Sequence, residues 1–137
     1  MMSQKTNSSE VDALVKEKLM PMRERVLEGF EKNHPHIFSI INPLLENKKN
    51  KFGLQVTENG QVVGEYVLYL GGLRVENVEG GKLDSEFNHP FMGVIKPYAS
   101  IERKTIEKII SDEENLQNDL FPTVAKYLPE MTIKFLP

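Results

Sequence analysis

The chain has 137 residues, the length of one domain, and its 39% hydrophobic content predicts a folded chain with its own core. Seventeen basic and twenty acidic residues give a net charge of −3, which argues against a general binder of nucleic-acid backbones. The absence of cysteine excludes disulfides, thiol nucleophiles, iron–sulfur clusters and cysteine-ligated zinc, so we expect a binding protein rather than an enzyme.

The first ten residues are polar, and we expect them to form a disordered tail. This leaves residues 11–137 as a single α+β domain. The polar start is unlike the apolar segment of a signal peptide. Since no stretch approaches the roughly 20 apolar residues that span a membrane, we expect no transmembrane segment and a cytoplasmic location.

A helix is predicted at the front of the chain, because apolar residues recur at spacings of three and four. Pro21 lies inside this pattern, so we expect a kink there, or two helices that meet near Met20. The apolar stripe comprises Val11, Leu14, Val15, Leu19, Met22, Val26 and Phe30.

A second helix is predicted from the apolar spacing of Ile37, Ile40, Ile41 and Leu44. Asn33 is the expected N-cap, and Pro35 fits the first turn because its missing N–H has no partner there. Pro43 and the polar run after it are expected to end the helix.

Alternation with period two follows and predicts three strands joined by two hairpins. We expect a three-residue turn at residues 58–60, which pairs Leu54 with Gly64 and keeps Glu65 off the core face. Residues 71–72 predict a two-residue turn. The expected core face consists of Phe52, Leu54, Val56, Val62, Tyr66, Leu68, Leu70, Leu73 and Val75. We expect the opposite face to be mostly solvated.

The remainder of the chain predicts a loop over residues 79–93 and a fourth strand over residues 94–101. Apolar spacing predicts short helices over residues 106–110 and 120–128, and alternation predicts a last strand over residues 131–135. Together these elements predict an α+β fold. It has a mainly antiparallel five-stranded sheet with the N-terminal and C-terminal helices packed on one face.

Signals for cofactors and metals are weak. Gly81 and Lys82 lack the earlier glycine and the following Ser or Thr of a phosphate-binding loop, so we expect no cofactor. His34 and His36 diverge by roughly 200° on a helix, whereas helical metal ligands are three or four residues apart. We therefore expect no metal site.

Two loops suggest alternative functions. An enzyme could use His89 with Asp84 or Glu86, although a turn role for this histidine is favoured. The basic run at residues 48–51 would suit peripheral contact with anionic lipid head groups, although a solvated turn is favoured there too.

Residues 51–56, with the turn after them, and residues 99–110, where a strand runs directly into a short helix, form a distinctive order. A Leu/Phe-rich helix and a basic-apolar strand then complete the chain from Leu120 to Phe135. This order resembles the sterol carrier protein type two (SCP-2-like) lipid-transfer domains over about residues 25–137. The stretch at residues 80–93 and the sequence Tyr-Leu-Pro-Glu-Met before the last strand depart from the family pattern. The resemblance implies a hydrophobic tunnel between sheet and helices that binds lipids, fatty acyl groups or sterols.

We therefore predict a lipid, sterol or fatty-acyl carrier with no catalytic residues and an apolar cavity between the sheet and its helices. The expected ligand-binding residues are Phe52, Leu54, Tyr66 and Leu68 on the floor, with Ile106, Ile109, Phe121 and Val124 on the helical wall. The alternative is a non-catalytic interaction module that docks on a partner, or forms a homodimer, through its N-terminal helix.

Overall fold

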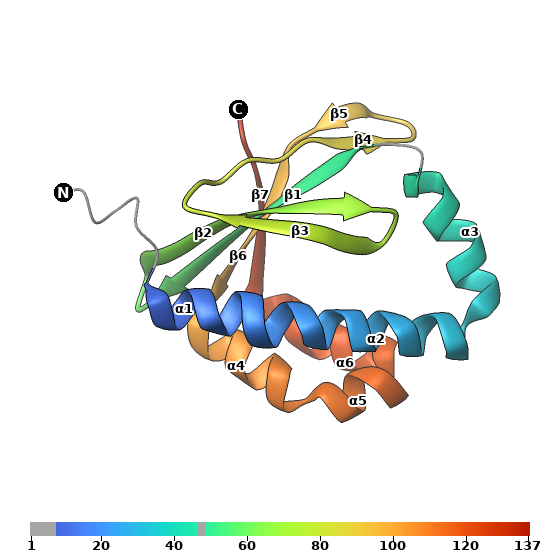
Figure 1. Ribbon diagram of the computed structural model, residues 1–137, viewed down its shortest axis with the longest axis horizontal. Helices are drawn as coiled ribbons and strands as arrows, with labels where there is room; N and C mark the ends of the chain where they lie inside the picture. The colour runs from blue at the N-terminus through green and yellow to red at the C-terminus, as the bar shows by residue number, and fades with distance from the viewer. Residues whose placement is uncertain (1–7, 47–48) are drawn as a thin grey trace.

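A five-stranded mixed sheet lies at the centre of an α+β fold in the computed structural model, which describes residues 8–46 and 49–137 (Figure 1). The strands, in spatial order, are β3 (Arg74–Gly80), β2 (Gln61–Gly71), β1 (Asn50–Glu58), β6 (Pro97–Glu102) and β7 (Met131–Phe135). The predicted α+β class and five strands are confirmed. The sheet is mixed because β1 and β6 run parallel, while the other neighbours are antiparallel.

The parallel pair arises from the connection after β3. Residues 81–86 lead the chain back toward the start of β1, where Glu86 pairs with Lys51. The chain then forms a small hairpin of β4 (Phe87–His89) and β5 (Gly93–Ile95) before β6 begins. The expected loop at residues 79–93 therefore contains the end of β3 and all of β4, and the expected fourth strand is divided into β5 and β6. Sequence pattern does not indicate strand direction, so the parallel pair was missed.

The front of the chain is helical without a break from α1 (Ser9–Ala13) through a π-helical segment (Leu14–Leu19) to α2 (Met20–Asn33). The π segment ends two residues before Pro21, and the wider turn accommodates a residue that cannot donate a backbone hydrogen bond. The two-helix interpretation is therefore wrong. Ser8 caps the helix by accepting a hydrogen bond from the backbone N–H of Val11 (3.4 Å).

The expected tail over residues 1–10 is only partly covered, since residues 1–7 lie outside the described part of the chain. Ser9 and Glu10 already belong to α1, so the helix begins two residues earlier than predicted.

Helix α3 (Pro35–Glu46) departs from α2 and stands beside the sheet (Figure 1). Asn33 is the last residue of α2 rather than the N-cap of α3, and Pro43 lies inside the helix rather than ending it. The side chain of Asn42 accepts a hydrogen bond from the backbone N–H of Leu73 (2.9 Å), which ties α3 to the β2–β3 turn.

The first hairpin has a two-residue turn, not the predicted three-residue one. Asn59 and Gly60 both have positive φ, at 53° and 82°, which is typical of a type I′ turn. A bulge then shifts the register by one residue, because Val56 pairs with Gly64 while Thr57 pairs with Val62. Tyr66 therefore lies opposite Leu54, and both side chains are buried in the core.

The second hairpin also turns one residue later than predicted, at Gly72 and Leu73, and it also contains a bulge. Leu70 pairs with Val75, whereas Leu68 pairs with Val78. Of the nine predicted core-face residues, Val62 is exposed.

The main core lies between the sheet and the helices that cover one of its faces. Helix α4 (Arg103–Ser111) follows β6 directly, as predicted, and contributes the fully buried Ile106. The buried members of the main core are Val11, Leu14, Val15, Leu54, Val56, Tyr66, Leu68, Ala99, Ile101 and Ile106. Figure 1 shows helices α1, α2, α4, α5 (Glu113–Asn118) and α6 (Leu120–Tyr127) on one side of the sheet, and the β4–β5 hairpin on the other.

The opposite face of the sheet is less solvated than expected, because the connection after β3 crosses it. Val67 on that face is fully buried. A Cβ atom added at Gly53 would lie 2.7 Å from the Cβ of Tyr98 and 2.9 Å from a methyl of Leu83. Glycine at position 53 therefore allows the connection to pack closely on the sheet.

Within the described residues, no helix is long and apolar enough to cross a membrane.

Candidate functional site

A pocket of about 320 Å³ lies between α2 and the three C-terminal helices, beside the start of β7. Its volume falls at the lower end of the range of small-molecule sites, about 300–1,000 Å³. It is lined by Met22, Arg23, Val26, Ile109, Leu116, Leu120, Val124, Tyr127 and Met131. All of these except Arg23 and Tyr127 are wholly apolar, so the pocket suits a ligand with a hydrocarbon part.

Helical spacing explains why these side chains converge. Met22 and Val26 are four residues apart on α2, and Leu120, Val124 and Tyr127 follow the same periodicity on α6. Met22, Ile109, Leu116 and Tyr127 form a second buried cluster, separate from the main core. The pocket therefore lies at the margin of this smaller cluster, where four helices meet.

The predicted ligand-binding residues are distributed over three places. Leu54, Tyr66, Leu68 and Ile106 are buried in the main core together with α1, and Phe52 packs against that core. Val11 and Val15 occupy the space above this part of the sheet.

The other three predicted residues lie near the second cluster. Ile109 and Val124 line the pocket. Phe121 is 52% exposed, and its ring packs against those of Phe30 (6.1 Å between centroids) and His34 (5.4 Å). The structure thus brings Ile109 and Val124 together but separates them from the predicted floor.

Sequence reasoning missed most of the lining. Met22 and Val26 were assigned to the apolar stripe of the first helix, and their spacing could have placed them opposite α6. Leu116 lies on α5, a helix that was not predicted. No sequence signal distinguishes Arg23 from the exposed arginine two positions later.

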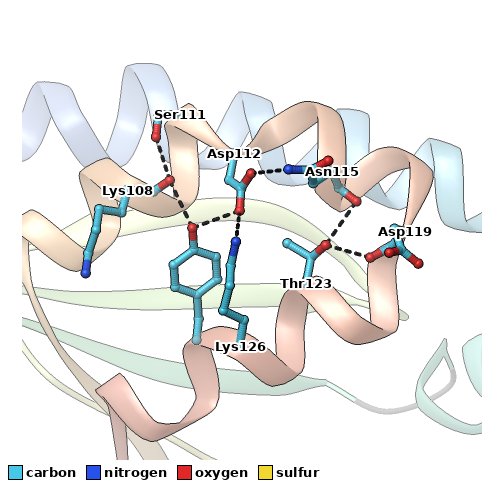
Figure 2. Close-up of polar contacts among 8 residues, drawn as sticks. Lys108, Ser111, Asp112, Asn115, Asp119, Thr123 and Lys126 are labelled. Atoms are coloured by element: carbon cyan, nitrogen blue, oxygen red, sulfur yellow. Dashed lines mark hydrogen bonds and ion pairs between the residues drawn. The ribbon is translucent and has the colours of Figure 1, made fainter.

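A polar network holds the helices that form the pocket wall (Figure 2). Asp112, between α4 and α5, accepts hydrogen bonds from Nζ of Lys126 (2.7 Å) and from the hydroxyl of Tyr127 (2.9 Å) on α6. It also accepts one from the amide of Asn115 (2.6 Å). At the start of α6, the hydroxyl of Thr123 donates to the carbonyl oxygen of Asp119 (2.7 Å). The network orients Tyr127, which lines the pocket.

Hydrogen bonds from Lys126, Asn115 and Tyr127 lower the pKa of Asp112 to about 2. A carboxyl group with a lowered pKa stabilises the fold above its unfolded pKa of about 3.9, and this contribution is lost as the pH falls through about 2. We therefore predict that Asp112→Asn lowers the melting temperature at pH 7, and that its difference from the wild type shrinks between about pH 4 and pH 2. Thermal melts across this range test the prediction.

Glu114→Gln is the matched control, because Glu114 lies two residues after Asp112, on α5, and is exposed. A difference between Asp112→Asn and the wild type that stays constant down to pH 2 would contradict this role of the carboxylate.

His89, the residue proposed for the enzyme alternative, is the last residue of β4 and adjoins the β4–β5 turn. Its Nδ1 accepts hydrogen bonds from the backbone N–H groups of Phe91 (3.0 Å) and Met92 (3.1 Å). Asp84 accepts a hydrogen bond from Nζ of Lys51 (2.9 Å). The observed contacts of His89 are those of a turn residue.

The lysines of the basic run at residues 48–51 do not share one environment. Lys51 is paired with Asp84, Lys49 is exposed, and Lys48 lies outside the described residues. Among the residues that the structure describes, no group of three or more histidine, aspartate or glutamate side chains is placed to hold a metal ion.

Comparison with protein-family models and with curated proteins finds no match to this chain.

Proposed function

We propose that the chain is a binding protein for a small molecule with a hydrocarbon part, of the fatty-acyl or lipid class, and that the pocket between α2 and α6 receives it. The observation that carries the proposal is the pocket of about 320 Å³ with its almost wholly apolar lining. Affinity would come from burial of apolar surface, at roughly 25 cal/mol per Å² before the costs of association.

The resemblance to SCP-2-like domains supports the same ligand class. The direct step from β6 to α4, which carried part of that resemblance, is present in the structure. The site proposed here keeps Ile109 and Val124 from the predicted set and replaces the sheet floor with residues of α2, α5 and α6.

The interaction-module alternative is less well supported. The apolar stripe of the N-terminal helix packs inside the chain, with Val11 and Val15 fully buried and Met22 nearly so. This stripe is therefore already covered by the sheet and the C-terminal helices. A homodimer, peripheral membrane contact and a cytoplasmic location stay predictions.

The proposed function is tested with the delipidated full chain and decanoate. We expect a one-to-one complex by native mass spectrometry, and shifts in the methyl NMR signals of Ile109, Leu116 and Val124 on titration. Methyl signals of Leu54 and Leu68 in the packed core should move little. Absence of a complex together with unchanged methyl signals would refute the proposed function, whereas shifts confined to Leu54 and Leu68 would place the ligand at the predicted floor instead.

A further inference from the structure

Arg23 is the one cation among the residues that line the apolar pocket. Its side chain is 33% exposed as a whole, but its Nη1 atom is buried and donates no hydrogen bond. A buried charged donor without a hydrogen bond is costly, so native proteins rarely leave one in this state. Nη1 of Arg23 therefore lacks a hydrogen-bond partner at a buried position where one is expected.

The nearest carboxylate does not supply that partner. Nη1 of Arg23 lies 3.5 Å from Oε2 of Glu24, without hydrogen-bond geometry. Glu24 is also engaged by β3, since it accepts hydrogen bonds from Nη1 of Arg74 (3.4 Å) and from the backbone N–H of Val75 (3.3 Å). One carboxylate is thus shared between two arginines.

The other arginines of the chain, all within the described residues, donate hydrogen bonds to carboxylates. Arg25, two positions away on the exposed side of α2, donates two hydrogen bonds to Glu113 (2.7 and 2.9 Å). Arg103 donates to Glu10 (3.2 Å). By contrast, burial lowers the pKa of Arg23, and Glu24 opposes this only in part. An additional anion at Arg23 would compensate the buried charge.

We propose that the pocket binds a single-chain amphiphile with a carboxylate head group, and that the guanidinium of Arg23 holds this carboxylate while the hydrocarbon chain packs on the apolar lining. The proposal rests on the function proposed above and names its ligand class. The planar guanidinium fork matches the two oxygens of a carboxylate. A single lining cation balances a singly charged head group better than a phosphate dianion, and the modest volume favours one short chain.

The test compares decanoate with decanol, which has the same chain length and no charge, by isothermal titration calorimetry on the full-length protein. We expect Arg23→Met to weaken decanoate binding roughly tenfold or more, in line with the loss of a charged hydrogen bond, and to leave decanol within about twofold. Arg25→Met is the matched control and should change neither ligand, because Arg25 is paired with Glu113 outside the pocket.

A second measurement follows the carboxyl carbon of [1-¹³C]decanoate by NMR during a pH titration. We expect the bound carboxylate to resist protonation to lower pH than the free ligand, and this shift to disappear in Arg23→Met. If Arg23→Met does not fold, Arg23→Lys replaces it. This variant keeps the charge but not the planar fork, so it should still favour decanoate over decanol, by a smaller factor.

The outcomes separate the two proposals. Equal binding of decanoate and decanol that is insensitive to Arg23→Met would overturn the carboxylate proposal and leave the apolar binding function standing. Binding of neither ligand by the wild type would overturn both. A wild type that prefers decyl phosphate to decanoate would show that the head group is a phosphate, and would also overturn the proposal.

Discussion

Ile106→Ala is expected to lower the free energy of unfolding by about 2–5 kcal/mol, the range for truncating a buried isoleucine. Ile106 is fully buried and belongs to the main core, where α4 packs against β1 and β6. Truncation would leave a cavity whose walls are held by the strand ladder, so little relaxation is expected. Urea denaturation followed by circular dichroism measures the change.

Ile133→Ala is the matched control. Ile133 lies on the outermost strand β7 and is 53% exposed, so its truncation should change stability by about 0.5 kcal/mol or less. Similar losses in the two variants would contradict the assignment of Ile106 to the main core.

Val124→Phe is expected to remove measurable binding of decanoate and decanol alike. Val124 lines the pocket from α6. The pocket volume of about 320 Å³ leaves little room for both a phenyl ring and a ligand. Because the added ring fills existing space, stability should be retained or slightly raised. Titration calorimetry and a thermal melt of the same sample separate loss of binding from loss of folding.

Val94→Phe is the control for this substitution. It makes the same change on β5, at a side chain that is 56% exposed and outside the pocket. It should bind both ligands as the wild type does. If Val124→Phe also bound them with unchanged affinity, the ligand could not occupy the pocket between α2 and α6.

The two binding variants report on different properties of the pocket. Val124→Phe should remove both ligands because it occupies the space that the hydrocarbon chain requires. Arg23→Met should discriminate between them because it removes only the charge. A folded protein with both results would have a site in which shape accepts the chain and Arg23 selects the head group.

The hairpins show why register was only partly predictable from sequence. Asn59 and Gly60 indicated the first turn correctly, but its length was chosen to keep Glu65 off the core face. The structure solves the same conflict with a two-residue turn and a bulge in β2, a local irregularity that no alternation pattern specifies. The need to keep Glu65 off the core face was identified correctly, but the predicted three-residue turn was wrong.

The sequence by itself determined most of the helices and strands, though not α5 or β4, because hydrophobic periodicity reports directly on one-sided burial. It also determined the α+β class and placed Ile109 and Val124 on helices that face inward. The tertiary structure alone decided the parallel β1–β6 pair, the packing of α1 on the predicted ligand floor, and the meeting of α2 with α6 around a pocket. It also decided the difference between Arg23 and Arg25. Both are arginines two positions apart on one helix. Arg25 is paired with Glu113, from a segment distant in the chain, whereas Nη1 of Arg23 makes no hydrogen bond, and sequence spacing carries no information about such contacts.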